Sequence, residues 1–504
     1  MLFNSIEFII FFSIVAVIYY RIPYKWRWAW LLACGFWFYM SFAPWFILPL
    51  LSVILIEYLA ARLIEQKENR SISARIFLAV GITYPLILLI IFKYLPFFND
   101  AVAQTARLLH LNYPQKIVNL IIPVGISYYA LQSISYVIEV YRGSQKAERH
   151  FGIYALHISF FPKIIAGPIE RPNLIKQFLR KRPPDYRDIT DGLRLMAFGF
   201  FKKLVIADRI GIAVNEVYNH PYDYHGIYHI LATAFFSVQL YCDFSGYSDI
   251  AKGAARVLGL RLMDNFKRPY GARSIREFWR RWHISLTTWL RDYWYIPLGG
   301  NRVAGWRWQY NLFITFLASG LWHGASWTFV AWGVLHGLYV LAGVWSIRVR
   351  SNLVHRIGLY RLPRLYRGLQ VSVTCILVGF AWIFFRADTL SDALYMARQV
   401  FTGAGDFLSM LFADDAAGLR ALFNIARDNT ILGFSRETYR PEMLIALVSI
   451  ISLGIISTVQ ERTNAGEALL KKGAFVRWSL YYLLASAVLF FGMFTKEQFI
   501  YFRF

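Results

Sequence analysis

Long apolar stretches separated by short charged segments repeat along the whole chain. About 20 apolar residues are enough for a helix to cross the hydrocarbon core of a bilayer. The pattern therefore predicts a series of membrane-spanning helices rather than the amphipathic helices of a soluble domain. The expected spans lie at Phe3–Tyr20, Trp28–Met40 with Trp45–Ala61, Ile76–Phe92, Val118–Tyr141, Ile189–Ile210, Tyr228–Ile250, Gln370–Phe385, Met443–Ser457 and Trp478–Met493.

Two further apolar stretches do not fit a simple crossing. Phe151–Ile169 and Gln309–Trp345 each have basic segments on both sides, and Gly320, His323 and Gly324 interrupt the middle of the second. Basic residues concentrate on the cytoplasmic side, so both ends of each stretch are expected there. We predict re-entrant or paired segments, whose irregular backbone is tolerated where protein or a cavity surrounds it.

The distribution of Lys and Arg orients the predicted spans. The first basic residue, Arg21, follows the first span, which places the N-terminus outside. No Lys or Arg lies between Arg209 and Lys252, whereas residues 252–307 carry twelve of them. We therefore expect 252–307 to be a basic interfacial segment in the cytoplasm. Following the alternation further places a loop at 388–441 and the C-terminus outside.

Composition narrows the class of protein. Hydrophobic residues make up 57% of the chain, aromatic residues 18% and charged residues 17%, against about 25% charged residues in soluble domains. These values exclude a disordered chain, a collagen, a coiled coil and an ordinary cytosolic enzyme. We predict a single all-α polytopic membrane domain, 1–504, with roughly nine to thirteen transmembrane or re-entrant helices.

The net charge of +24 would suggest nucleic acid as a partner of a soluble protein. Cytoplasmic loops that contact anionic lipid explain the charge better in a membrane protein. No basic arm, RNA-binding signature or DNA-binding helix pair accompanies it. We predict the lipid bilayer, and no nucleic acid, as a partner.

One histidine in an apolar segment is the strongest candidate for chemistry. His323 lies between glycines and tryptophans in SGLWHGASW, residues 319–327. Ionisable groups at membrane depth are costly and are therefore candidates for function. A neutral imidazole can act as a general base toward a hydroxyl. A histidine bonded to a carbonyl inside the bundle is the structural alternative, and the local sequence does not decide between the two.

The stretch Ser274–Tyr295 combines arginines with tryptophans. At 100° per residue, Arg276, Arg280 and Arg291 fall opposite an aromatic face, which predicts one amphipathic helix at the cytoplasmic interface. Such an anchor needs no further role. The functional alternative is that the three arginines bind an anionic donor, such as the phosphates of coenzyme A, while His283 points into the core.

Other polar residues are expected to have structural roles. Asp243 and Asp249 lie at the inner end of a span, where we expect them to pair with arginines rather than to act in catalysis. His225 and His229 have a spacing that suits a metal, but their Pro- and Tyr-rich segment lacks a helical pattern, so we predict no metal site. The chain also lacks a P-loop, a dinucleotide-binding glycine motif and a G-x-S-x-G elbow, which argues against ATPases, dehydrogenases and serine hydrolases.

Six segments, in this order, resemble the membrane-bound O-acyltransferase family, and within it the bacterial alginate O-acetylases. Any one of them is a weak signal, but six in the right order are specific, and the resemblance covers nearly the whole chain. They are IPVGISYY at 122–129, FFPKIIAGPI at 160–169, DFSGYSD at 243–249, REFWRRWHISL at 276–286, PLGGNR at 297–302 and LWHG at 321–324.

The resemblance implies a helical bundle that encloses a central funnel or tunnel. His283 and His323 match the two histidines of the family, and His323 is the one that the resemblance implies to be catalytic. The implied enzyme is an O-acetyltransferase without a bound cofactor, which uses acetyl-CoA or another activated acetyl donor as a substrate. The acetyl groups would cross the inner membrane to an exported polysaccharide acceptor such as alginate.

The resemblance also implies partners and a location. Periplasmic acetyltransferase proteins of a polysaccharide-modification complex are the implied partners, and the bacterial inner membrane is the implied location, with both termini periplasmic. Two alternatives stay open. Family members also modify peptidoglycan, cellulose or teichoic acid, and a multispan transporter could use the same intramembrane ionisable groups, although such proteins commonly contain repeats that this sequence lacks.

Overall fold

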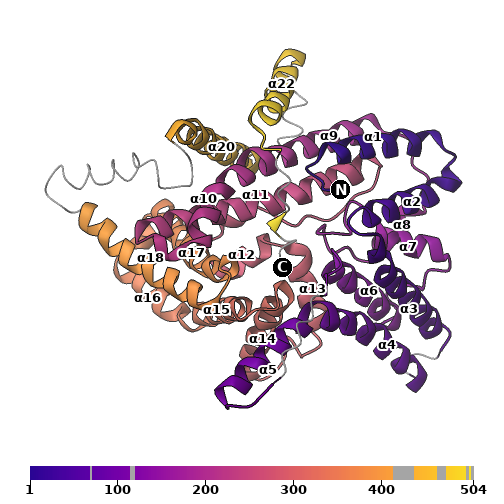
Figure 1. The fold of residues 1–504 in the computed structure, drawn as a ribbon, viewed down its shortest axis with the longest axis horizontal. Helices are drawn as coiled ribbons and strands as arrows, with labels where there is room; N and C mark the ends of the chain where they lie inside the picture. The colour runs from indigo at the N-terminus through magenta and orange to yellow at the C-terminus, as the bar shows by residue number, and fades with distance from the viewer. Residues whose placement is uncertain (68–70, 114–119, 412–435, 463–472, 495–498, 501–504) are drawn as a thin grey trace.

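The computed structural model describes residues 1–67, 71–113, 120–411, 436–462, 473–494 and 499–500. Every regular element within these ranges is a helix, which confirms the predicted all-α fold (Figure 1). Five helical stretches in the described ranges are long and apolar enough to cross a membrane. These are Pro44–Glu65, Ile72–Leu108, Trp327–Trp345, Pro363–Arg386 and Ala474–Phe491.

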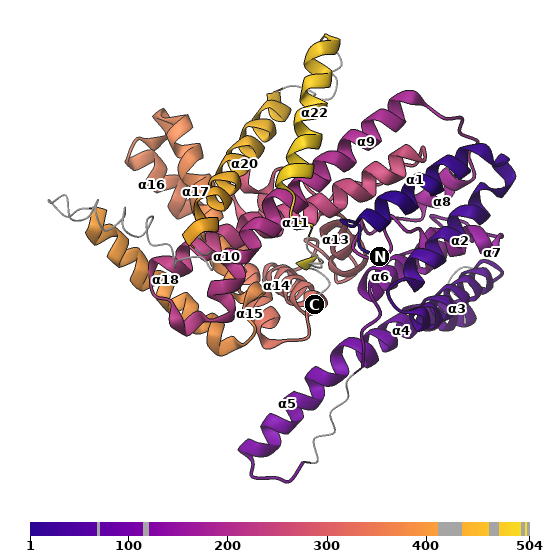
Figure 2. The same cartoon turned by 45° about the horizontal axis from the view of Figure 1, so that its top comes forward.

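The N-terminal helices form one side of the molecule (Figure 1). Helix α5 (Leu95–Leu108) continues from α4 through a π-helical turn, η3 (Ile90–Tyr94), and projects away from this side (Figure 2). The helices of the side itself are α1 (Ile6–Arg21), α2 (Arg27–Met40), α3 (Ile47–Glu65), α4 (Ile72–Leu89), α6 (Ile126–Tyr141), α7 (Phe151–Ser159) and α8 (Asn173–Phe178).

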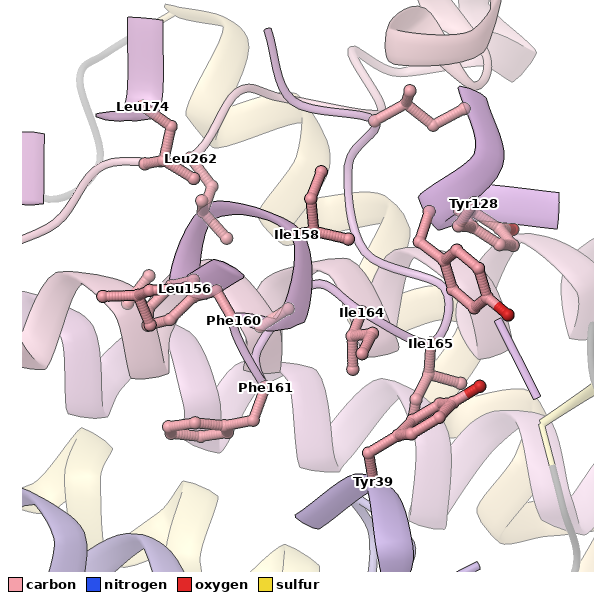
Figure 3. Packing of buried hydrophobic residues seen from close by; sticks show 14 of the residues in the cluster. Tyr39, Tyr128, Leu156, Ile158, Phe160, Phe161, Ile164, Ile165, Leu174 and Leu262 are labelled. Carbon is pink, nitrogen blue, oxygen red and sulfur yellow. The ribbon is translucent and has the colours of Figure 1, made fainter. Parts of the chain in front are cut away.

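An irregular segment that follows α7 packs into the core of this side of the molecule. Ile164 and Ile165 of this segment are gathered in the same buried cluster as Tyr39 of α2 and Tyr128 of α6 (Figure 3). The backbone of the segment comes so close to α6 that a side chain at Gly125 would collide with the carbonyl of Ile164. Gly125 also has φ of 78°, a conformation that favours glycine.

The centre of the molecule is built on α11 (Ile227–Val257), the longest described helix. Its 31 residues span about 46 Å at 1.5 Å per residue. The backbones of α9 and α11 approach closely. A Cβ at Gly199 would lie only 2.7 Å from the carbonyl oxygen of Gly246. Small residues at such crossings are typical of packed membrane helices. The elements that pack on α11 in this part of the chain are α9 (Tyr186–Phe200), the π-helical turn η4 (Phe201–Ala207) and α10 (Asp208–Asn219). The short helices α12 (Ile275–Arg281) and α13 (Ile284–Leu290) follow it in the chain.

The C-terminal helices form the opposite side. Helices α20 and α22 project from the bundle in both views (Figures 1 and 2). The elements in chain order are α14 (Gly305–His323), α15 (Trp327–Trp345), α16 (Ile347–Arg356), α17 (Pro363–Arg386), α18 (Leu390–Leu411), α20 (Arg436–Arg462) and α22 (Ala474–Phe491).

Several predicted boundaries can be compared with these elements. The prediction of paired segments is confirmed for 309–345, since α14 and α15 pack together and are joined by residues 324–326 alone. The helix expected from Val118 begins only at Ile126. Within the predicted outer loop 388–441, Leu390–Leu411 is helical and 412–435 lies outside the described residues, as do residues 501–504 at the C-terminus. The sidedness of the loop, of segment 252–307 and of both termini stays a prediction.

Candidate active site

His323 is the last residue of α14 and is almost completely buried, with 3% of its surface exposed. Its Nδ1 lies 2.6 Å from the carbonyl oxygen of Ser319, one turn earlier in the same helix. A carbonyl only accepts hydrogen bonds, so Nδ1 carries the hydrogen and the lone pair of the neutral ring is on Nε2. The helix therefore fixes both the tautomer and the orientation of this imidazole.

The position of His323 depends on a close crossing between α14 and α15. A Cβ at Gly333 of α15 would lie 2.8 Å from the carbonyl oxygen of Phe316, and a Cβ at Gly320 would collide with the carbonyl of Phe329. The side chain of Ser326 caps α15 by accepting a hydrogen bond from the amide of Thr328. The S-G-L-W-H-G-A-S motif thus comprises the last residues of α14 and the short connection to α15, and the two helices meet through their backbones.

His283 lies at a break between two short helices. Its backbone is left-handed, with φ of 43° and ψ of 52°, which is uncommon for a residue with a side chain. Asn265 holds the chain directly after the break: its carbonyl accepts from the amide of Ile284 at 2.9 Å, and its side-chain oxygen accepts from the amide of Ser285 at 3.4 Å. This arrangement turns the imidazole inward, where none of its surface is exposed.

The prediction of a single helix over Ser274–Tyr295 is wrong. The segment consists of α12, the turn at His283, α13 and a π-helical turn η7 (Arg291–Tyr295). The expected aromatic face exists, but Phe278 and Trp282 pack fully buried in the protein interior rather than in a lipid belt. The periodicity of the sequence identified the buried face and missed the break, because the break is held by contacts with Asn265, which lies outside the segment.

The two predicted histidines come together in the interior. Their ring centroids are 6.1 Å apart, and aromatic rings surround both. Phe244 of α11 lies 4.8 Å from His283, and Trp332 of α15 lies 4.9 Å from His323. Phe385 of α17 also packs on His323, at 5.5 Å. Walls of this kind exclude water, and a neutral imidazole within them can move a proton to or from a substrate oxygen.

Comparison with known proteins decides the family. The model of the MBOAT, membrane-bound O-acyltransferase family matches residues 150–356, which include both histidines. The probable alginate O-acetylase of Pseudomonas putida is 35% identical over 87% of this chain and 88% of its own length. The chain belongs to the membrane-bound O-acyltransferase family. It is an acyltransferase and a multi-pass membrane protein.

Other relatives of this acyltransferase carry different names. The peptidoglycan O-acetyltransferase of Helicobacter pylori is 32% identical over 83% of this chain and 82% of its own length. The teichoic acid D-alanyltransferase of Bacillus subtilis is 29% identical over 44% of this chain and 58% of its own length. The family thus includes enzymes named for different acceptors and for different acyl groups.

Another buried histidine beside this site of the acyltransferase, His336, was missed in the sequence. It lies on α15, and its Nδ1 accepts a hydrogen bond from the indole Nε1 of Trp279 at 3.3 Å. Trp332 lies between the two histidines of this helix pair, with its ring 4.9 Å from both His323 and His336. An ionisable residue within an apolar span was the available signal, and the same signal would have found Lys93 in η3.

The three candidate donor-binding arginines of the acyltransferase lie apart from the histidines. Arg276, Arg280 and Arg291 are exposed at the surface, whereas both imidazoles are buried. Arg291 contacts the carboxylate of Asp292 at 2.7 Å. The arginines could bind a charged group at the surface, but they are not part of the buried site.

The carboxylates of the D-F-S-G-Y-S-D motif pair with lysines, and the expectation of arginine partners is wrong. Lys203 lies 2.6 Å from Asp243 and 2.7 Å from Asp208, and Lys202 lies 2.6 Å from Asp249. Both lysines come from the π-helical turn η4. We call these five residues the lysine–aspartate cluster. The second oxygen of Asp243 accepts a hydrogen bond from the backbone amide of Ile500 at 2.9 Å.

The two histidines considered for a metal have protein partners. His229 Nε2 lies 3.1 Å from the carbonyl oxygen of Pro221, and His225 Nδ1 lies 3.3 Å from the hydroxyl of Tyr395. Across the ranges that the structure describes, no three His, Cys, Asp or Glu side chains gather in a group that could hold a metal ion.

Proposed function

We propose that this acyltransferase passes acetyl groups from an activated cytoplasmic donor across the bacterial inner membrane, for O-acetylation of an exported polysaccharide such as alginate. The observation that carries the proposal is the pair of buried imidazoles, 6.1 Å apart, with the Nδ1 of His323 bonded to a main-chain carbonyl. The named relatives support an acetyl group and a polysaccharide acceptor.

In the proposed mechanism, His323 is the general base. Its Nε2 takes the proton of an acceptor hydroxyl while the hydroxyl oxygen attacks the carbonyl carbon of an acetyl thioester. The carbon–sulfur bond then breaks, and the departing sulfur takes the proton back from His323. The surrounding rings keep water out, which would otherwise hydrolyse the thioester. His283 supports the site from the opposite wall.

The donor is proposed to arrive from the cytoplasm, as acetyl-CoA or another activated acetyl compound. Exposed Arg276, Arg280 and Arg291 suit the phosphates of such a donor, because guanidinium groups bind phosphate through paired hydrogen bonds. We propose accordingly that segment 252–307 lies on the cytoplasmic side, and that both termini lie in the periplasm. Periplasmic acetyltransferase proteins would then complete the transfer to the polymer.

Peptidoglycan is the second candidate acceptor. The Helicobacter pylori relative with this name matches the chain over a share similar to that of the alginate relative, 83% against 87%. The chemistry at His323 would be unchanged, because the acetyl group leaves the donor in the same step whichever polymer the periplasmic proteins then acetylate.

The experiment compares strains that lack the gene and carry wild type, His323→Ala or His220→Ala. Acetyl content is measured in both the exported polysaccharide and the peptidoglycan. His220 is a matched control because it is an exposed histidine at the end of α10. We expect polysaccharide acetylation with wild type and His220→Ala, and none with His323→Ala, although all three proteins accumulate in the membrane.

Each result has a defined meaning. Acetylation of peptidoglycan alone would replace the proposed acceptor and keep the mechanism. Full acetylation with His323→Ala would overturn the role of His323 as the base. Acetylation that never depended on the gene would overturn the proposed function itself.

A further inference from the structure

The helix that carries His323 ends inside the protein rather than in solvent. The last carbonyl groups of an α-helix have no amide partner within the helix, and burying them without a donor is costly. Helix α14 ends at His323, and the chain then leaves in an extended conformation at Gly324. The end of α14 therefore needs hydrogen-bond donors from elsewhere in the chain.

Two neighbouring residues of η3 supply these donors. The ammonium of Lys93 donates to the carbonyl oxygens of Trp322 at 2.7 Å and His323 at 3.0 Å. The hydroxyl of Tyr94 donates to the carbonyl oxygen of Leu321 at 2.7 Å. Three successive carbonyls, up to the one of His323 itself, are thus held by a segment more than 200 residues away in sequence.

The surroundings of Lys93 suit a side chain that holds the end of α14. Lys93 is 6% exposed and lies within a span that is apolar enough to cross a membrane. Among the described residues no carboxylate lies within ion-pair distance of it, so its described contacts are the helix carbonyls. A cation at that position also faces the negative end of the helix dipole. The π-helical turn that bears it is a rare element, and such turns occur frequently at functional sites.

We propose that Lys93, assisted by Tyr94, is a positioning residue for His323. The inference rests on the proposed function, in which Nε2 of His323 is the base. The imidazole is then fixed twice: its Nδ1 is bonded to Ser319 of the same helix, and its main chain is held by Lys93. Loss of the Lys93 contacts would let the end of α14 shift relative to the bound substrate, and a displacement of about 1 Å can reduce a rate by about 100-fold.

The test uses the full-length protein in lipid nanodiscs with acetyl-CoA and a soluble sugar acceptor. Wild type is compared with His323→Ala, Lys93→Met, Lys93→Arg and Tyr94→Phe. We expect Lys93→Met to lower kcat by about 10- to 100-fold with the donor KM nearly unchanged. Lys93→Arg should recover most of the kcat, because guanidinium still donates to the carbonyls, and Tyr94→Phe should lower kcat by a smaller factor.

Hydrogen exchange of the backbone amides in 318–326 gives a readout that does not depend on activity. We expect faster exchange in Lys93→Met and Tyr94→Phe, and near-normal exchange in Lys93→Arg. If Lys93→Met does not fold, Tyr94→Phe decides by the same two measurements. Wild-type kcat and wild-type exchange in the folded variants would overturn the proposal, as would equal losses of kcat in Lys93→Met and Lys93→Arg with unchanged exchange.

The two proposals fail in different ways. A fully active His323→Ala counts against the proposed function, as does a wild-type protein that transfers no acetyl group to the sugar while the strain that carries it acetylates no polymer. The exchange measurement would still test the contacts of Lys93 in that case. Full activity in Lys93→Met beside an inactive His323→Ala counts against the positioning role alone.

Discussion

Two buried polar regions meet at α11 and are built in opposite ways. In the lysine–aspartate cluster every charged group meets an opposite charge, as Lys203 does between Asp208 and Asp243. The two central histidines pack against aromatic rings instead. The change happens between neighbouring residues, because Asp243 belongs to the first region and Phe244 contacts His283 in the second.

This difference indicates which region does chemistry. Paired charges inside a membrane protein satisfy each other, and removing one partner leaves the other buried and uncompensated. Such a cluster stabilises the packing of η4, α10 and α11. Imidazoles among aromatic rings contribute little to stability as charges, but they can exchange protons with a substrate. We therefore expect substitutions in the two regions to affect different measurements.

The largest expected effect is on the rate. Removing a general base costs about 10²- to 10⁴-fold, so His323→Gln should lower kcat by that factor, with the unfolding temperature in detergent close to wild type. The matched control is His355→Gln, an exposed histidine on α16. An unfolding temperature that falls together with kcat would mean that His323 is structural, and the comparison between the regions would fail.

The next largest effect is expected on the stability of the protein, for a substitution in the lysine–aspartate cluster. Breaking a buried ion pair costs about 3–5 kcal/mol, so Asp243→Asn should lower the free energy of unfolding and the amount of protein in the membrane. Acyl transfer per folded molecule should change much less. Asp249→Asn is the control, because its side chain is 18% exposed and its loss should cost less. Equal stability of both variants would contradict the assigned role.

A substitution at the crossing of α14 and α15 should have an intermediate effect on stability and on kcat. A methyl group at Gly320 has no room beside the carbonyl of Phe329, and such overpacking costs about 1–3 kcal/mol. Gly320→Ala should lower both the unfolding temperature and kcat, since it moves the helix that bears His323. Gly343→Ala on α15 is the control, because a Cβ there meets nothing within 4 Å. A Gly320→Ala protein with wild-type kcat would show that the crossing does not position His323.

The smallest effect is expected at the surface. Exposed ion pairs contribute about 0–1 kcal/mol, so the double substitution Arg276→Gln and Arg280→Gln should raise the donor KM by only a few-fold and leave kcat unchanged. The effect should shrink as salt is added. Arg107→Gln, on the projecting helix α5, is the control for the loss of one exposed positive charge away from the segment. If the donor KM changes neither in the double variant nor with added salt, Arg276 and Arg280 do not bind the donor.

Much of the fold follows from the sequence because membrane burial leaves a strong pattern. Apolar length located the membrane-length helical stretches Pro44–Glu65, Ile72–Leu108, Pro363–Arg386 and Ala474–Phe491. The basic flanks of 309–345 predicted the helix pair that carries His323. Both central histidines were also identified, by the LWHG and RRWHIS motifs.

Contacts between distant segments could not be predicted. The break at His283 depends on Asn265, and the end of α14 depends on Lys93, more than 200 residues earlier in the chain. The partners of Asp243 and Asp249 were misjudged for the same reason. The basic segment 252–307 that follows these carboxylates is rich in arginine, whereas the lysines that bind them lie on η4, 40 to 47 residues earlier in the chain.

The hydrogen bond between Ile500 and Asp243 has a consequence for the timing of synthesis. The two residues are 257 positions apart. At about 5–20 residues per second, the ribosome needs roughly 10 to 50 seconds to make the chain between them. Helix α11 is therefore complete, with Asp243 on it, well before the amide that joins this carboxylate has been translated. The lysines of η4 are made earlier than α11, and they can neutralise the carboxylate during this interval.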